Sequence, residues 1–401
     1  MESKKLLIIC FTFPPVPGIG GRRWAKYSKY LLRNKIDVRL VTADLPHTND
    51  SEWTNDIKEL NSQKRIHYFK PNYPTYLLKN TSTVIDKIGY KLSLFYAKWK
   101  IKGNYYDKSA LCKKELLAQV VPLIEQGYNN IILSVGPFYY STFLIELKNK
   151  FPHVNFILDV RDPWTNNKMA FGYWTLPNHR FLVEKTAEKM VFKEYNKIIT
   201  VANEMSEYYI NEYHRNEKDV VTLNNGYDQE DFISKDSIVS SNSIVFTGTL
   251  YEKAMDSFLM FYNQLREQNN HYTFHFYGEI HPSYSPFFKQ SKYLFYHGKI
   301  PLNEVYNKIA ESSACLLFLT DDITFSFSTK FVEYISQKKS ILVFSKPGKT
   351  GEFVEINQLG FQMNENNLYE SLNSLHLLQY NYDISQFDVK NLTLKLINLL
   401  H

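Results

Sequence analysis

Residues 10–32 read CFTFPPVPGIGGRRWAKYSKYLL, an apolar run that ends in prolines and glycines and passes into a helical pattern. A strand that turns directly into a helix is the unit from which α/β folds are built. Gly20 and Gly21 permit close backbone approach, and Arg22 opens a helix whose N-terminus carries partial positive charge. The stretch predicts an anion site, with a purely structural turn as the equal alternative. The glycines lack the G-x-G-x-x-G spacing, which argues against a nicotinamide site.

Bulk composition predicts a globular protein of two domains in a reducing compartment. The chain has 401 residues, more than one ordinary core accommodates. Cys10, Cys112 and Cys315 lack disulfide or zinc spacing. The apolar run after the N-terminal lysines has no small-x-small cleavage site and stops at Pro14-Pro15, so we expect a first core strand and not a signal peptide. No run reaches about 18 apolar residues, so no spanning helix is predicted and the expected location is cytoplasmic.

Short apolar runs alternate with segments of helical period along most of the chain, which predicts parallel sheets covered by helices on both faces. The expected strands are Leu6–Phe13, Asp37–Thr42, Asn130–Val135, Asn155–Val160, Lys197–Val201, Ser243–Thr247, Tyr272–Tyr277, Tyr293–Tyr296, Ala314–Leu319 and Ser340–Phe344. The expected helices are Arg22–Arg33, Phe138–Lys150, Arg180–Tyr195, Met255–Glu267, Asn303–Glu311 and Lys330–Gln337.

The polar, serine-rich stretch 228–243 is expected to separate two doubly wound, Rossmann-like domains, 1–230 and 243–385. A final helix within 386–401 is expected to cross back to the first domain. Ligands of such sheets bind beyond the carboxyl ends of the strands. The cleft between two opposed sheets is therefore the expected active site.

A second constellation, ILDVRDPWTN at residues 157–166, follows the end of an expected strand. It contains Asp159, Arg161, Asp162 and Trp164. Two carboxylates that flank an arginine beside an aromatic ring can orient a sugar through paired hydrogen bonds and stacking. The alternative interpretation is a buried Asp–Arg ion pair that fixes the loop.

A third constellation, at residues 326–344, begins with a helix start. Ser328 or Thr329 is the expected N-cap, and Lys330 and Glu333 lie three residues apart on one helical face. A lysine at that place can bind a diphosphate, and a carboxylate one turn later can accept hydrogen bonds from a ribose diol. The alternative is a surface salt pair that contributes little.

The loop after the expected strand Ser243–Thr247 contains Gly248 and Lys253. A lysine in this loop can share the charge of a phosphate. Taken alone, this is a weak pattern.

Together these stretches resemble the glycosyltransferases of GT-B architecture, in the large retaining group called family 4. The resemblance rests on the PPxxGxGxxRxxKxxKYL start, the DxRDPW loop, NGYDQEDF within residues 222–232, GTLY in the fourth stretch and the K-x-x-E-Y pattern of residues 330–334. These motifs occur in the family's order over most of the chain. The resemblance implies an acceptor-side N-terminal domain and a C-terminal domain that binds a nucleotide sugar.

The resemblance also assigns expected roles to single residues. Asp162, with Arg161, would face the reacting sugar or acceptor as the catalytic pair, and Asp159 and Trp164 would lie on the acceptor side. The implied donor-binding residues are Gly20, Gly21, Arg22, Gly248, Lys253, Lys330 and Glu333, with the two lysines on the diphosphate and Glu333 on the ribose.

Two positions depart from the family pattern. Phe325 stands where many members have the first glutamate of E-x7-E, so sugar recognition would differ or use Asp321 or Asp322. Thr249 stands where the family has an arginine, which would leave more of the phosphate charge to Lys253.

No cofactor and no metal are expected. Fixed lysines and a helix N-terminus can stabilise a leaving diphosphate, and the chain contains no D-x-D triplet of the metal-dependent GT-A type. Retention of anomeric configuration is implied by the resemblance. The rival hypotheses are a nucleotide-sugar epimerase on the same fold and a degenerate subunit that binds a nucleotide sugar without turnover.

Basic residues concentrate in residues 64–118, which hold twelve Lys/Arg and three Asp/Glu. The rest of the chain is close to neutral, which argues against nucleic-acid binding and for one basic surface. As a helix, residues 84–102 place Ile85, Ile88, Leu92, Phe95 and Trp99 on one face and Lys87, Lys91, Lys98 and Lys102 on another. This pattern is typical of a helix on an anionic membrane and equally of one packed on its own domain.

Overall fold

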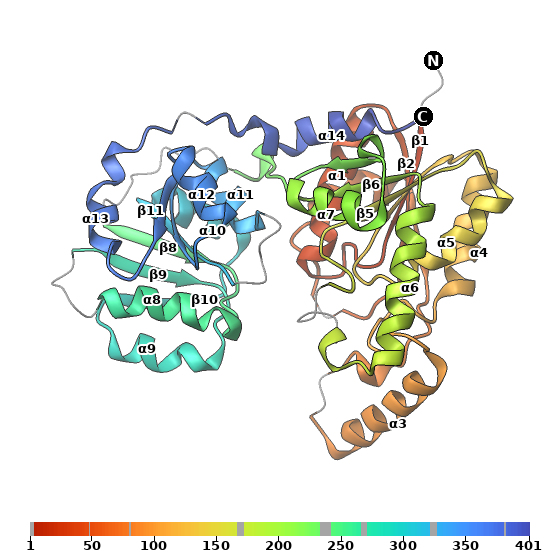
Figure 1. The fold of residues 1–401 in the computed structure, drawn as a ribbon, viewed down its shortest axis with the longest axis horizontal. Helices are drawn as coiled ribbons and strands as arrows, with labels where there is room; N and C mark the ends of the chain where they lie inside the picture. The colour runs from red at the N-terminus through yellow and green to blue at the C-terminus, as the bar shows by residue number, and fades with distance from the viewer. Residues whose placement is uncertain are drawn as a thin grey trace. The chain divides into compact units, whose positions relative to one another are not determined.

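The computed structural model describes residues 4–47, 49–79, 82–166, 172–232, 242–265, 271–320, 327–380 and 382–401 (Figure 1). The chain divides into two units. Unit 1 comprises Met1–Leu223 with Thr393–His401, and unit 2 comprises Asn224–Leu392. The division therefore falls just before the stretch 228–243, of which residues 233–241 lie outside the described ranges.

Unit 1 contains a seven-stranded parallel sheet in the order β3-β2-β1-β4-β5-β6-β7. Its strands are β1 (Lys5–Cys10), β2 (Asp37–Ala43), β3 (Ile66–Phe69), β4 (Asn130–Ser134), β5 (Asn155–Val160), β6 (Lys197–Thr200) and β7 (Val220–Thr222). The central strands are buried along their length, as expected for apolar runs covered on both faces.

The helices of unit 1 follow the helical period of the sequence. In the first helix Trp24, Tyr27 and Leu31 recur at three and four residues and are buried. The helices are α1 (Arg22–Arg33), α2 (Lys58–Ser62), α3 (Val84–Lys100), α4 (Lys113–Glu125), α5 (Ser141–Lys150), α6 (Asn178–Glu194) and α7 (Asn203–Tyr213).

The end of the chain belongs to unit 1 from Thr393 onward, within and after helix α14 (Val389–Ile397). Asn155, the first residue of β5, donates from Nδ2 to the carbonyl of Leu399 at 3.2 Å. Asn130, the first residue of β4, accepts at Oδ1 from the backbone N–H of His401 at 2.9 Å. The C-terminal residues thus cover the amino ends of two central strands.

Unit 2 contains a six-stranded parallel sheet in the order β10-β9-β8-β11-β12-β13. Its strands are β8 (Ser243–Thr247), β9 (Thr273–Tyr277), β10 (Leu294–Gly298), β11 (Ala314–Phe318), β12 (Ser340–Phe344) and β13 (Gly360–Met363). Its helices are α8 (Met255–Leu265), α9 (Ser285–Gln290), α10 (Leu302–Glu311), α11 (Thr329–Ser336), α12 (Lys349–Ile356) and α13 (Leu368–Asn373).

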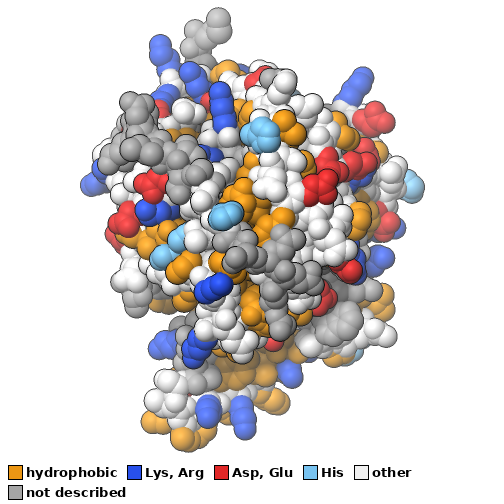
Figure 2. Space-filling model, turned by 90° about the vertical axis from the view of Figure 1, so that its left-hand side faces the viewer, with side chains coloured by type: hydrophobic (Ala, Val, Ile, Leu, Met, Phe, Trp, Pro, Cys, Tyr) orange, Lys and Arg blue, Asp and Glu red, His pale blue; other side chains and the backbone are white. Residues whose placement is uncertain are grey.

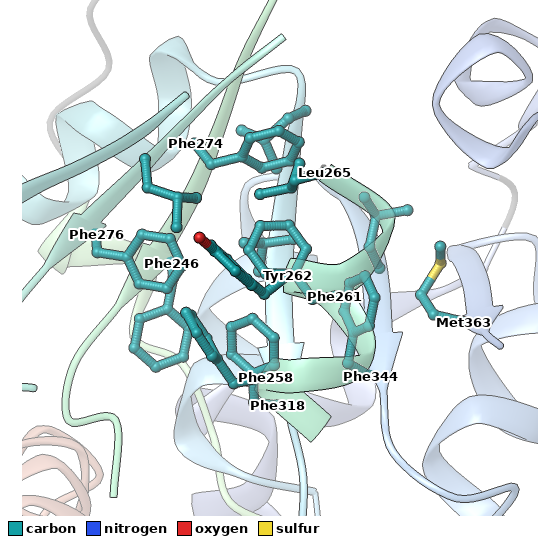
Figure 3. Close-up of a cluster of buried hydrophobic side chains, with 14 of the residues drawn as sticks. Phe246, Phe258, Phe261, Tyr262, Leu265, Phe274, Phe276, Phe318, Phe344 and Met363 are labelled. Carbon is teal, nitrogen blue, oxygen red and sulfur yellow. The ribbon is translucent and has the colours of Figure 1, made fainter. Parts of the chain in front are cut away.

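Alternate strand residues of unit 2 enter two different cores. Phe246 belongs to one aromatic cluster with Phe258 and Phe261 of α8, shown in Figure 3. The neighbouring Val245 packs with residues of α10, α11 and α12 on the other face of the sheet. Side chains alternate between faces along a strand, so this period of two identifies a sheet covered on both sides. The prediction of two doubly wound α/β domains is confirmed.

Both sheets contain one point at which the strand order reverses. In unit 1 the strands that follow β1 and the strands that follow β4 are added on opposite sides of this central pair. In unit 2 the same holds for β8 and β11. The loops that leave such a pair of strands diverge, which opens a crevice at their carboxyl ends where ligands of this fold class bind. The glycine turn follows β1 at the first switch point, and the GTLY loop follows β8 at the second.

Candidate functional site

The glycine turn lies after β1, at the switch point of unit 1, and α1 begins directly after it. A Cβ at Gly21 would lie 2.8 Å from Cδ of Pro14 and 3.0 Å from Cα of Phe13, so the turn itself requires a glycine there. At Gly20 the nearest atom would be Cβ of Thr12 at 3.8 Å. Packing within the turn therefore requires the absence of a side chain at Gly21 but not at Gly20, and in this the two predicted donor-site glycines differ.

Arg22 is buried and lies with its guanidinium 5.1 Å from the centre of the Trp53 ring. The first turn of α1 thus places Arg22 against Trp53, and its expected contact with the donor stays a prediction.

Asp159 is fully buried at the end of β5 and connects three elements of unit 1. Its Oδ2 accepts from Trp24 Nε1 at 2.9 Å and from Ser134 Oγ at 2.8 Å, and its Oδ1 lies 3.3 Å from Arg23 Nε. The carboxylate faces the interior of unit 1, and its expected contact with the acceptor stays a prediction. The contacts of Asp159 match the alternative interpretation, a buried Asp–Arg ion pair, and the partner is Arg23 of α1.

Arg161, two residues later, holds the glycine turn. Its Nη1 donates to the carbonyl of Gly20 at 2.9 Å, and its Nη2 lies 3.5 Å from the carbonyl of Val135, just after β4. Residues two apart in an extended chain point the same way. Asp159 and Arg161 thus hold α1 and the turn before it onto the ends of β4 and β5.

The loop after Arg161 is held from the other side by helix α6. Trp164 donates from Nε1 to Glu184 Oε2 at 2.9 Å, and the backbone N–H of Thr165 donates to Glu188 Oε2 at 3.3 Å. Glu184 and Glu188 are four residues apart on one helical face. Trp164 is buried and stacks on Phe138 with ring centres 5.3 Å apart. The ring of Trp164 thus lies in the core, and its expected contact with the acceptor stays a prediction.

Asp162 is exposed, in contrast to Asp159 and Trp164. The residues of the motif DVRDPW therefore have two different roles in the fold. Asp159, Arg161 and Trp164 hold the backbone, and Asp162 presents a carboxylate to solvent on a loop fixed at both ends.

Burial and the nearby Asp107 raise the pKa of the Glu184 carboxyl to about 7. Between about pH 4.5 and pH 7, Glu184 is therefore protonated in the folded state and ionised in the unfolded state. Stability consequently falls as pH rises through this range, by up to about 3 kcal/mol.

We expect Glu184→Gln to flatten this pH dependence of the free energy of unfolding. Burial also raises the pKa values of Asp107 and Glu188, so part of the slope remains in the variant. Urea denaturation between pH 5 and pH 8 measures the slope. An unchanged slope in Glu184→Gln would show that Glu184 is not the titrating group.

At the switch point of unit 2, two glycines bring the loops after β8 and β9 together. Gly248 and Gly278 have φ of 92° and 128°. A Cβ at Gly278 would lie 2.2 Å from the carbonyl oxygen of Gly248. The backbone of the loop after β8 is thus tightly held and carries no side chain at Gly248, the predicted donor-site residue.

Lys330 of α11 lies against this loop. Its Nζ donates to the carbonyl of Thr249 at 2.9 Å and lies 4.5 Å from the centre of the Phe246 ring, and a Cβ at Gly248 would be 2.6 Å from its Cε. Burial lowers the pKa of Lys330 to about 8, with Glu333 acting in the opposite direction. The structure thus brings Gly248 and Lys330 together, with a lysine whose charge lacks full solvation.

Tyr334 attaches the same helix to β8. Its hydroxyl accepts from the backbone N–H of Thr247 at 3.0 Å. The β8–β11 pairing extends only over Ala314–Ile244 and Cys315–Val245, so this N–H lies past the ladder. The start of α11, capped by Ser328 Oγ on the N–H of Phe331, is therefore fixed at the switch point.

The remaining predicted residues of unit 2 have different settings. Glu333 is buried on α11, whereas Lys253 is exposed in the short 3₁₀ turn Glu252–Ala254 that precedes α8. Asp321, Asp322 and Phe325 lie outside the described residues.

Sequence reasoning missed Glu184, Glu188 and the hydroxyl of Tyr334. The four-residue spacing of the two glutamates was a visible signal, but the same spacing is common on solvated helix faces. Tyr334 ends the K-x-x-E-Y pattern, which does not indicate what its hydroxyl contacts.

No protein-family model matches the chain, and no curated protein sequence matches it. Solved structures match over nearly its full length. Alr3699/HepE of Anabaena, in complex with UDP and glucose, has a TM-score of 0.58 at 11% identity, covering 98% of both chains. The lipopolysaccharide outer core galactosyltransferase WaaB has a TM-score of 0.57 at 13% identity, also covering 98% of both chains.

The N-terminal domain of trehalose-6-phosphate phosphatase from Candida albicans matches with a TM-score of 0.61 at 11% identity, covering 99% of this chain and 96% of that one. Together with the two sheet orders, these similarities establish that the chain has the fold of GT-B glycosyltransferases, two Rossmann-like domains in succession.

Proposed function

We propose that the protein transfers a glycosyl group from a nucleotide-diphosphate sugar to a saccharide or lipid-linked saccharide, with retention and without a metal ion, as a family 4-like enzyme of polysaccharide biosynthesis in the cytoplasm. The observation that carries the proposal is Lys330, a half-buried lysine beside the Gly248 turn at the switch point of unit 2. The fold shared with glycosyltransferases supports it.

Departure of a nucleoside diphosphate requires positive charge at the leaving oxygens. The ammonium of Lys330 and the N-terminus of α11 supply positive potential at one place, and both are fixed before substrate binds. Preorganised charge in a site of restricted solvation stabilises a developing anion strongly. Lys253 adds a second cation from its exposed turn, and Glu333 accepts hydrogen bonds from the ribose.

Asp162 is proposed to face the reacting sugar or the acceptor. Its exposure on a loop held by the Gly20 carbonyl and by α6 supports this role. Arg161 acts mainly by holding the glycine turn, so we now propose it as a positioning residue. Gly20 is the residue of the turn that we propose contacts the donor, because it has space for a ligand beside it and Gly21 does not.

The first experiment measures thermal stabilisation by UDP, GDP, dTDP and CMP with and without EDTA, followed by transfer assays with the sugar donor of the stabilising nucleotide. One nucleotide is expected to stabilise the protein equally in EDTA. Loss of the effect in EDTA would contradict metal-free binding. Epimerised donor formed without acceptor would identify an epimerase, and nucleotide binding without turnover of any donor would identify a degenerate subunit.

We expect Asp162→Asn to lower the rate of transfer by about 100-fold or more while nucleotide binding stays within about threefold, because a group acting on the reacting atoms contributes to the chemical step. Glu125→Gln, an exposed carboxylate on α4, is the matched control and should retain the wild-type rate. Equal rates in both variants would remove Asp162 from the reaction.

A further inference from the structure

Helix α3 has an apolar face that its own domain leaves uncovered. Ile85, Leu92, Phe95 and Trp99 are 72%, 68%, 75% and 71% exposed, and Ile88 is 55% exposed. They follow one another at three, four, three and four residues, so they form a continuous stripe along the helix. Large apolar side chains gathered at this density mark an interaction surface.

The opposite face of α3 is packed on unit 1. Ala97 and Ile101 are buried with Tyr73 and Tyr105, and Leu94 packs against this cluster. The stripe is therefore a second apolar face on a helix whose first is already occupied. Packing of the helix on its own domain thus does not account for the stripe.

Both ends of α3 are fixed. Thr83 and Asp86 form a capping box at its start, and the guanidinium of Arg180 donates to the carbonyls of Lys98 and Gly103 at its end. The helix exists before any partner binds, so binding does not have to order it.

Lysines flank the stripe. Lys87, Lys91, Lys98 and Lys100 are exposed. Lys100 Nζ lies 4.4 Å from the centre of the Trp99 ring of the stripe, whereas Lys98 Nζ lies 5.1 Å from the ring centre of Tyr105 in the packed cluster. Figure 2 shows hydrophobic and basic side chains together at the lower end of the view, the height at which Figure 1 places α3. The stripe is thus apolar along its middle and cationic along its borders.

We infer that α3 docks in the plane of an anionic lipid surface, with the stripe in the headgroup–acyl boundary and the lysines on the headgroups. Charge complementarity and the Leu, Phe and Trp side chains on a preformed helix select this occupant. Within the ranges that the structure describes, no helix is long and apolar enough to cross a bilayer. The contact therefore lies along the surface.

Flotation of the full chain with vesicles tests the inference independently of glycosyl transfer. Vesicles of phosphatidylcholine with about one third phosphatidylglycerol are expected to bind the protein at least tenfold more strongly than pure phosphatidylcholine vesicles, with the difference shrinking at high salt. Equal partitioning into both, or none, would overturn the inference.

Two variant pairs locate the surface. Phe95→Ser/Trp99→Ser removes two stripe residues, and its matched control, Ile356→Ser/Leu377→Ser, removes two residues of unit 2 that are 75% and 67% exposed. Lys91→Glu/Lys98→Glu is matched by Lys299→Glu/Lys349→Glu, whose side chains are 73% and 67% exposed. We expect at least tenfold weaker partitioning in the α3 variants only. Equal loss in the controls would contradict a specific role of α3.

A second copy of the chain is the competing occupant, and sedimentation without lipid decides between the two. We expect a monomer in the wild type and in Phe95→Ser/Trp99→Ser, with unchanged nucleotide stabilisation in the variant. A wild-type dimer that this variant dissociates would overturn the inference and make the stripe a subunit interface.

Discussion

Replacing Asp159 by alanine is expected to lower the free energy of unfolding of unit 1 by about 3–5 kcal/mol. The substitution removes the buried carboxylate that lies 3.3 Å from Nε of Arg23 and accepts the Trp24 and Ser134 hydrogen bonds. Urea denaturation followed by tryptophan fluorescence measures this effect. All five tryptophans of the chain, Trp24, Trp53, Trp99, Trp164 and Trp174, belong to unit 1, so the signal reports on that unit alone.

Asp162→Ala is the matched control, because it deletes an exposed carboxylate from the same loop and should change stability by less than about 0.5 kcal/mol. Asp159→Asn keeps one acceptor and removes the charge, so an intermediate loss is expected. If Asp159→Ala were no more destabilising than Asp162→Ala, the buried network would not be what holds α1.

Replacing Lys330 by methionine is expected to weaken nucleotide binding by about 10- to 100-fold, the range of a lost charge-assisted hydrogen bond. The stability of the folded protein should not decrease in the same way. The pKa of Lys330 is lowered by burial, so the folded state disfavours its charge, and a neutral side chain of similar length removes that cost. Titration of the nucleotide against each protein measures the first effect, and thermal unfolding measures the second.

The pH dependence gives this prediction a second readout. A bound diphosphate favours the charged lysine, so binding takes up a proton wherever free Lys330 is deprotonated. With a pKa of about 8 in the free protein, affinity should fall as pH rises from about 8 to 10, and Lys330→Met should lack this fall. Isothermal titration in buffers of different ionisation enthalpy measures the proton uptake.

Lys339 provides the control for Lys330. Burial lowers its pKa as well, but it precedes β12 and donates to the carbonyls of Ala310 and Ser312 at 2.6 and 2.8 Å, at the amino ends of the strands. Lys339→Met should bind nucleotide as the wild type does. Equal loss of affinity in both variants would show that Lys330 acts through folding.

Much of the fold could be predicted from the sequence because strands that are buried on both faces contain short runs of consecutive apolar residues. The strand Asn155–Val160 is built around the apolar run Phe156–Leu158, and its expected bounds agree with the structure. The edge strands β3, β7 and β13 were not predicted. They are short and lie at the margins of the sheets, where fewer positions need to be apolar.

The candidate site could be predicted as a set of stretches and not as a set of exposed side chains. The position of α11, its Ser328 cap and the presence of Lys330 on its first turn follow from residues close together in the chain. That Lys330 lies against Gly248 does not, because the two residues meet only when β8 and β11 become neighbours in the sheet.

The sequence by itself determined the α/β class, the central strands, the starts of α1 and α8 and the amphipathic character of α3, since each depends on the period of neighbouring residues. Only the tertiary structure decided which side chains are available. Trp24 lies 135 residues before Asp159, and Glu184 lies 20 residues after Trp164. These distant contacts bury two members of DVRDPW and leave Asp162 exposed. In the same way, only packing decided that the stripe of α3 stays uncovered, because a helix with two apolar faces can bury just one of them against a single core.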